Sequence, residues 1–154
     1  MRYIEQYGIK ASIEECQKDM FISRECDYAV RIVRSLSDYE IRNVNEICEK
    51  EHVPKQYAYK ILKKLIKSNI VQSYRGALGG FELAKSTGDI FLYDIIIAVE
   101  EDFGDSDCIN DSYSCPKGAK EERCKVHQEL FRVQSLLSDS LQEKSLHDIL
   151  SGSH

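Results

Sequence analysis

The segment from residue 52 to residue 83, HVPKQYAYKILKKLIKSNIVQSYRGALGGFEL, decides the fold of this chain. Six basic residues and no acidic residue lie between Glu51 and Glu82, so residues 52–81 carry a charge of +6. The whole chain has a net charge of -5, which leaves -11 for the rest. A polyanion responds to a local basic face far more than to a distant acidic one. The charge pattern therefore favours this segment as the binding surface for a polyanion.

The same segment predicts a basic helix followed by a small hairpin. Pro54 stands where a helix would begin, and apolar residues recur at helical spacing over residues 55–68, with the lysines mostly on the other faces. The apolar positions are Tyr57, Ile61, Leu62, Leu65 and Ile66. Residues 70–74 then alternate as a short strand, residues 76–80 supply the glycines of a tight turn, and residues 81–83 return as a second strand.

Two shorter helices are predicted before the basic one. Ser23 is a plausible N-cap for a helix over residues 24–36. Asn43, with Glu46 three residues later, forms a capping-box pattern at the start of a helix over residues 44–50. Two helices joined by a short turn, the second basic and followed by a hairpin, predict a mainly α protein with a winged helix-turn-helix domain and a small two-stranded wing.

An amphipathic helix with outward lysines is usually only a solvated face. Here the acid-free run, the arginine at the glycine-rich turn and the preceding short helix together favour double-stranded DNA as the partner. The second helix of such a unit enters the major groove, and its first residues lie nearest the base edges while later lysines face phosphates. The residues expected to contact DNA are Ser23, Arg24, Lys55, Gln56, Tyr57, Tyr59, Lys60, Lys63, Lys64, Arg75 and Gly76. Lys55, Gln56, Tyr59 and Lys60 are expected at base edges, Lys63 and Lys64 at phosphates, and Arg75 in the minor groove or at a phosphate.

The composition indicates a globular chain. Of 154 residues, 42% are hydrophobic and 31% charged, and only two are prolines. No apolar run approaches the length of about 20 residues that spans a bilayer, and no signal-peptide core follows Met1, so we expect a cytoplasmic protein with no membrane partner. The expected organisation is an N-terminal extension (1–19), a DNA-binding domain (20–90), a helix and cysteine loop (91–121), and a dimerisation helix with a closing helix (122–150).

The C-terminal third predicts three more helices, over residues 91–99, 124–141 and 145–150. The second of them is long, and its apolar positions recur at intervals of four, three, four and four. These positions are Val126, Leu130, Val133, Leu137 and Leu141. So long a stripe on the last major helix favours a homodimer interface, although the helix could also fold back onto its own core.

Three of the six cysteines gather in one part of the chain. Cys108, Cys115 and Cys124 are followed by His127, which supplies three thiolates and an imidazole. These donors suit an iron-sulfur cluster, zinc or copper(I), and the spacing alone does not choose among them. Cys26 and Cys48 instead fall on apolar helix stripes, where a cysteine is usually a small buried hydrophobe.

Four motifs carry a resemblance to a known family. They are RECDYAVR (24–31), VPKQY (53–57), RGxxGGFxL (75–83) and IxAVE (96–100). Through them residues 20–150 resemble the IscR/NsrR-type (Rrf-two) family of winged helix-turn-helix iron-sulfur transcriptional regulators. The RGxxGG-aromatic wing is the most specific of these motifs.

The resemblance implies a homodimeric transcription factor, commonly a repressor, that binds a palindromic operator. It implies that Cys108, Cys115 and Cys124 hold a [2Fe-2S] or [4Fe-4S] cluster, of which we favour [2Fe-2S]. His127 is the favoured fourth ligand, and Asp27 from the partner chain is the alternative. The cysteine intervals of six and eight residues are longer than those common in the family. The expected signal is redox state, nitric oxide or iron-sulfur status.

Other functions remain open from the residues themselves. A regulator of the same fold could use a disulfide between Cys108 and Cys115 or structural zinc in place of a cluster. A winged domain that binds another protein is an alternative of a different class. We expect no enzyme and no small-molecule substrate, because the chain has no nucleophile-base set, no phosphate loop followed by Lys-Ser/Thr and no paired carboxylates on rigid elements.

Overall fold

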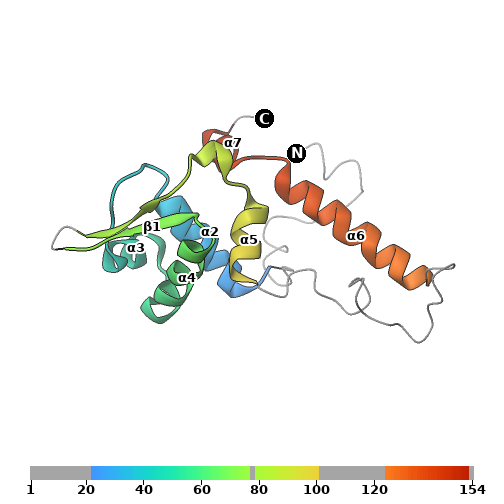
Figure 1. Ribbon diagram of the computed structural model, residues 1–154, viewed down its shortest axis with the longest axis horizontal. Coiled ribbons are helices and arrows are strands. Elements are labelled where there is room, and N and C mark those ends of the chain that lie inside the picture. Colours follow the sequence, from blue (N-terminus) through green and yellow to red (C-terminus); the bar gives the residue numbers. More distant parts are fainter. Residues whose placement is uncertain (1–21, 77–78, 101–123, 153–154) are drawn as a thin grey trace.

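The computed structural model describes residues 22–76, 79–100 and 124–152. Its elements, in chain order, are α2 (Arg24–Ser35), α3 (Val44–Glu51), α4 (Lys55–Lys67), β1 (Val71–Tyr74), β2 (Gly80–Leu83), the 3-10 turn η1 (Thr87–Asp89), α5 (Leu92–Val99), α6 (Lys125–Gln142) and α7 (Leu146–Ser151). The predicted fold class, mainly helical with a two-stranded antiparallel wing, is confirmed. The predicted helices are all present, and each end lies within two residues of its predicted place. Figure 1 shows the wing at one end of the molecule and α6 extending from the other.

Capping side chains fix where three of the helices begin. The Ser23 hydroxyl accepts a hydrogen bond from the Cys26 N–H at 3.2 Å, and the Ser145 hydroxyl accepts one from the Asp148 N–H at 3.2 Å. The Asn43 side chain accepts from Glu46 N–H, while the Glu46 carboxylate accepts from the Asn43 N–H at 2.8 Å. Each such cap stabilises its helix by about 1 kcal/mol. The predicted caps of α2 and α3 are therefore confirmed, and Ser145 caps α7 in the same way.

The hydrophobic core lies where α2, α4 and α5 pack on one another, with α3 against α2 and α4. Large side chains that are fully buried there include Ile32, Leu36, Ile47, Ile61, Leu62, Leu65, Ile95 and Ile96. Burial of each such side chain contributes roughly 1.5–3 kcal/mol relative to exposure. Cys26 is buried in this core and Cys48 packs partly buried against it, as predicted for small hydrophobes.

The wing is tied to the helices through Arg42. The two strands pair antiparallel, with Val71 opposite Leu83. Beyond them, Arg42 N–H donates to Phe81 O at 3.0 Å and Phe81 N–H donates to Arg42 O at 2.8 Å. The Arg42 guanidinium also donates to Ser35 O at 2.8 Å and pairs with Asp38, which holds the pKa of the Asp38 carboxyl well below its usual range. These bonds fix the base of the wing to the C-terminal end of α2.

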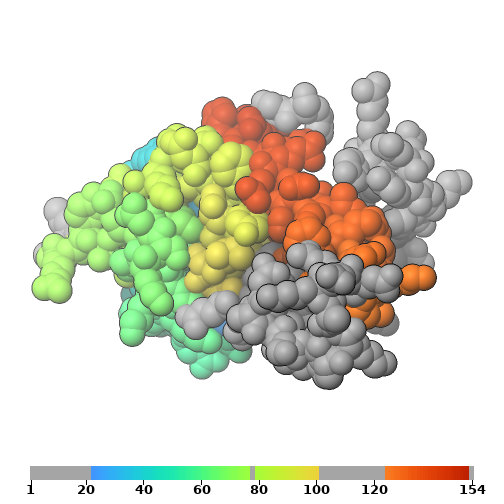
Figure 2. Space-filling view, turned by 45° about the vertical axis from the view of Figure 1, so that its right-hand side comes forward, coloured from blue at the N-terminus to red at the C-terminus, as the bar shows by residue number. Residues whose placement is uncertain are grey.

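The helix α6 lies at the edge of this core, against which its Leu141 packs partly buried. None of its residues is buried in the described part of the chain, and its neighbour is α5. Figure 2 shows α6 (orange) beside α5 (yellow), with α7 (red) next to it. After α6, the chain packs against the domain at α7, where Leu146 is buried and its N–H donates to Ile90 O at 2.7 Å. Across the residues that the structure describes, no helix is both long enough and apolar enough to cross a membrane.

We predict that Gly80→Ala destabilises the wing. A Cβ at Gly80 would lie 2.6 Å from Arg42 O, so the bonds between Arg42 and Phe81 must shift. Overpacking of this kind typically costs about 1–3 kcal/mol, which should appear as a lower midpoint in urea unfolding followed by circular dichroism. Gly88→Ala is the matched control, because its Cβ would meet only Ser86 Oγ, at 3.6 Å. An equal loss of stability in both variants would show that close backbone approach is not the reason for glycine at position 80.

Candidate nucleic-acid interface and sulfur-ligand site

The outer face of α4 is mainly polar and basic, because most apolar residues of this helix lie on the opposite face, which packs in the core. Ala58, Ile61, Leu62 and Leu65 of α4 are buried. The polar residues left facing solvent are Lys55, Gln56, Tyr59, Lys60, Lys63 and Lys67. Ile66, which the periodicity placed on the apolar stripe, is 37% exposed at the end of the helix. Residues three or four positions apart share one side of a helix, so the six polar residues form a continuous surface. We call these six residues the α4 face.

The N-terminus of α4 adds positive potential to that face. Its cap residue is Pro54, which supplies no side-chain hydrogen bond, and its first turn contains no acidic residue. The exposed N–H groups at a helix start carry a partial positive charge that favours anions such as phosphate. The α4 face therefore combines side-chain charge with the helix dipole.

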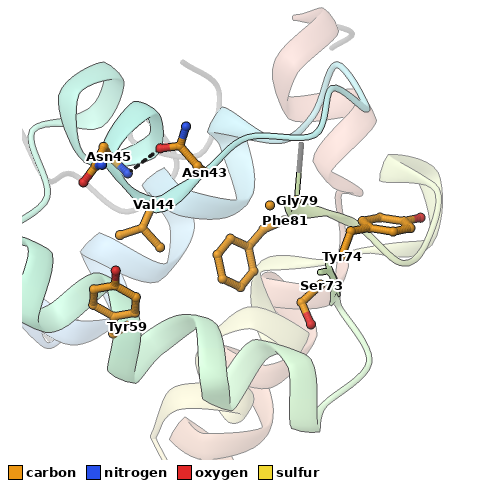
Figure 3. Close-up of a pocket in the computed structure, with 9 residues that line it drawn as sticks. Asn43, Val44, Asn45, Tyr59, Ser73, Tyr74, Gly79 and Phe81 are labelled. Atoms are coloured by element: carbon orange, nitrogen blue, oxygen red, sulfur yellow. Dashed lines mark hydrogen bonds between the residues drawn. The ribbon is translucent and has the colours of Figure 1, made fainter. Parts of the chain in front are cut away.

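A hollow of about 280 Å³ separates α4 from the wing. Its lining residues come from three parts of the chain, namely Asn43, Val44, Asn45, Tyr59, Ser73, Tyr74, Gly79, Gly80 and Phe81. Figure 3 shows Tyr59 of α4 below Asn45 and Val44 of α3. Phe81 of β2 lies between this group and the β1 residues Ser73 and Tyr74. Asn45, Ser73 and Tyr74 line this hollow but are not among the DNA contacts predicted from the sequence. No local pattern marks them, because only the folded chain places them beside Tyr59.

The wing turn places Arg75 and Gly76 on the surface. Both residues are exposed at the end of β1. Gly76 has φ of 117°, a conformation that residues with a Cβ rarely adopt, and its carbonyl accepts from the Gly79 N–H at 3.0 Å. Glycine at this position is therefore required by the turn itself. Residues 77 and 78 lie outside the described residues.

Four of the predicted DNA contacts have structural partners within the protein, and one of them is Lys60, whose ammonium lies 3.1 Å from Glu25 Oε2. Tyr57 is half-buried, and its ring packs edge-on against Tyr28 with centroids 5.4 Å apart. Ser23 caps α2 and donates its hydroxyl proton to the Glu100 carboxylate. Lys64 is half-buried, and its ammonium donates to Val99 O at 2.5 Å. Arg24, by contrast, is exposed at the start of α2.

The thiol of Cys26 lies at the junction of α2 and α5. Its Sγ is 3.6 Å from Glu100 Oε1. Burial, aided by the neighbouring Glu100 charge, raises the pKa of Cys26 to about 11. A thiol with so high a pKa stays protonated near neutral pH and is a poor nucleophile or metal ligand. Cys26 therefore packs rather than reacts.

Two of the predicted metal ligands stand at the start of α6. Cys124 is the N-cap residue, and His127 follows in the first turn, half-buried, with its ring stacked on Phe131 at 6.5 Å. A thiolate and an imidazole three residues apart on a helix start lie on one side and suit an iron-sulfur cluster or zinc. Cys108 and Cys115 lie outside the described residues. Among the residues that are described, no three His, Cys, Asp or Glu side chains gather as a metal site.

The alternative ligand, Asp27, has a partner in its own helix. Its Oδ2 lies 2.9 Å from Arg31 Nη2, and its Oδ1 accepts from Arg31 Nε at 3.2 Å. The side chain is more than a third exposed, so water screens this pair. Ligation by Asp27 would require the carboxylate to give up part of its pairing with Arg31.

Comparison with known proteins agrees with this arrangement. The model of the Rrf2 family, described as an iron-dependent transcriptional regulator, matches residues 22–152. A 94-residue stretch is 31% identical to the transcriptional regulator NsrR of Oceanobacillus iheyensis and covers 59% of this chain and 64% of that protein.

Two solved structures share the fold. IscR of T. potens has a TM-score of 0.67 at 22% identity and covers 88% of this chain and 89% of its own. CymR, the global cysteine regulator of B. subtilis, has a TM-score of 0.66 at 21% identity and covers 88% of this chain and 100% of its own. With the winged helix-turn-helix, the basic α4 face and a family match over residues 22–152, the chain belongs to the Rrf2 family of transcriptional regulators.

Proposed function

We propose that the protein is a homodimeric regulator, most simply a repressor, that binds a palindromic DNA operator with an affinity set by an iron-sulfur cluster. The observation that carries the DNA-binding part is the α4 face, an exposed row of four lysines beside a positive helix start and a glycine-turn wing. Membership of a family of transcriptional regulators also supports DNA binding.

In this proposal α4 enters the major groove. Lys55, Gln56 and Tyr59 in its first turns approach the base edges, and Lys63 further along binds a phosphate. Arg75, exposed at the end of β1, reaches the adjacent minor groove or a phosphate. The hollow beside Tyr59 is lined by α4 and by the wing, so the backbone of the duplex would pass over it.

The dimer would form through α6. Its exposed apolar side chains are Val126, Leu130, Phe131, Val133, Leu136 and Leu137, which are 40–62% exposed. Exposed apolar residues in such a run mark an interface rather than a solvated face. Leu141, the last residue of the predicted stripe, packs against the core of its own chain and so anchors α6 to its domain. Pairing of two α6 helices would hold the two α4 helices at a fixed separation, which must match half-sites roughly 34 Å apart.

The ligand set proposed for the cluster is Cys108, Cys115, Cys124 and His127. When bound, the cluster would supply redox and nitric-oxide chemistry that a chain of ordinary side chains lacks. Cys124 is the N-cap of α6 and Glu100 is the C-cap of α5, so residues 101–123 connect the core to the dimerisation helix. Ligation at Cys124 and His127 would hold the first turn of α6, and loss of it would release that turn. The spacing of the two α4 helices would change as a result.

A cluster-free regulator is the second candidate. Thiolates at Cys108 and Cys115 could close a disulfide, or the same residues could hold structural zinc. The similarity of fold to CymR, named for cysteine regulation, is compatible with a sulfur-based signal of this kind.

We predict that Lys63→Gln weakens binding to promoter DNA and reduces its salt dependence. Loss of one phosphate contact should lower the slope of log K against log salt by about 0.9 per protomer. Fluorescence anisotropy with a duplex at several salt concentrations measures both effects. Lys144→Gln is the matched control, because Lys144 is exposed beyond the end of α6. If the unaltered protein shows no salt-sensitive retention on any duplex, the winged domain instead binds another protein.

We predict that Val133→Glu disrupts the dimer without unfolding the protomer. Val133 is 49% exposed, so the new charge lies in water in the monomer and in an apolar interface in the dimer. Sedimentation velocity should show a shift to the monomer mass, and the unfolding midpoint of the core should stay in place. Gln142→Glu adds the same charge at an exposed position nine residues further on, which faces the opposite side of α6 from Val133, and should leave the dimer intact. If Val133→Glu were as dimeric as the control variant, the dimer interface would not include Val133.

We predict that protein purified without oxygen is coloured and contains iron and sulfide. Replacing Cys108, Cys115 and Cys124 by Ala should remove both the visible absorption and the regulation of DNA binding. A thiol switch would leave the unaltered protein colourless and metal-free, while structural zinc would leave it colourless with one zinc per chain. Retention of iron and of unchanged regulation in the triple variant would contradict the assigned ligands.

A further inference from the structure

One acidic residue approaches the basic α4 face from another helix. Glu25 lies in the first turn of α2, and its Oε2 is 3.1 Å from Lys60 Nζ, while its Oε1 is 3.4 Å from Lys64 Nζ. The sequence places Glu25 outside the acid-free segment, 35 residues before Lys60. Only the packing of α2 on α4 brings this carboxylate to the two lysines.

The two lysines are held differently. Lys64 is 21% exposed and donates to Val99 O at 2.5 Å, so its ammonium is fixed between α2 and the end of α5. Lys60 is 59% exposed, and its ion pair with Glu25 is the contact that the structure gives its ammonium. An exposed ion pair of this kind contributes only about 0–1 kcal/mol and is easily exchanged for another anion. Lys60 can therefore leave Glu25, whereas Lys64 is held in place.

The Glu25 carboxylate is partly buried and incompletely hydrogen-bonded, on a helix start that is tied to α5. The Ser23 and Cys26 side chains on either side of Glu25 both bond to Glu100, which ties the start of α2 to the end of α5. Glu25 is 20% exposed, and its Oε1 accepts no hydrogen bond from any residue that the structure describes. A partly buried carboxylate retains more of its attraction for a cation than one in open water. Glu25 thus presents a partly buried carboxylate to Lys60.

We propose that Glu25 is an internal competitor of DNA for Lys60. It pairs with Lys60 in the unbound protein and gives Lys60 up when a duplex arrives, so it lowers the affinity of the α4 face for DNA. This inference rests on the proposed DNA-binding function and adds a residue that acts on that function without touching DNA. Glu25 is a positioning residue, since it acts through Lys60.

The test is Glu25→Gln, which removes the charge and keeps the size of the side chain. At low salt, the variant should bind promoter DNA roughly three- to tenfold more tightly per dimer, because Lys60 no longer leaves an ion pair. The slope of log K against log salt should become steeper by up to about one per protomer, since no freed carboxylate takes up a cation. Glu143→Gln, at the exposed end of α6, removes the same charge elsewhere and should change neither value.

A double variant assigns the effect to Lys60. Lys60→Gln should weaken binding more in the Glu25→Gln background than in the unaltered protein, because only there is Lys60 fully available. If Glu25 were purely structural, Glu25→Gln would lower the unfolding midpoint and leave the affinity equal or weaker. That result would overturn the inference. So would additive effects of Glu25→Gln and Lys60→Gln on the free energy of DNA binding.

A resin of heparin, a polyanion without base edges, separates this inference from the proposed function. Glu25→Gln should elute from it at higher salt than Glu143→Gln, and equal elution would overturn the inference. If Glu25→Gln eluted from heparin at higher salt and no variant bound duplex DNA, the competition between Glu25 and a polyanion would be supported, and the proposed DNA-binding function would be overturned.

Discussion

The packing of α4 against α2 and α5 is the constraint on which the rest of the structure depends. The buried row of Ala58, Ile61, Leu62 and Leu65 sets the rotation of α4 about its axis, and with it the residues that face solvent. Rotation by a single residue would turn each side chain by about 100° and bury lysines at a large desolvation cost. The same packing brings Glu25 of α2 next to two lysines of α4, so the basic surface contains one built-in anion. Both the α4 face and its charge balance are therefore consequences of the core.

Members of the Rrf2 family regulate transcription, so the winged domain and the helix α6 can be explained together, as the parts of one DNA-binding regulator. The winged half carries the α4 face, and the other half carries Cys124 and His127 at the first turn of a helix with exposed apolar residues. A site at the start of α6 would be well placed to act on the proposed dimer, because Cys124, His127 and the exposed stripe share one helix. The chemistry of the donors supports a cluster, while thiol oxidation and zinc use the same residues.

The sequence by itself determined most of the local structure. Helix periodicity, the caps at Ser23, Asn43 and Ser145 and the glycines of the wing turn are signals between near neighbours, which is why the helices lie within two residues of their predicted ends. The separation of basic from acidic residues along the chain likewise identified the basic surface. These features depend on backbone hydrogen bonds and side-chain spacing over a few residues.

Only the tertiary structure decided how distant residues meet. It put Lys64 against Val99 and Glu25, turned Tyr57 onto Tyr28 and placed Asn45, Ser73 and Tyr74 around one hollow. It also showed that Gly80 is needed for the close approach of Arg42, which no turn pattern predicts. The physical reason is that each of these contacts joins residues from separate elements, so it exists only once the core has fixed their relative positions.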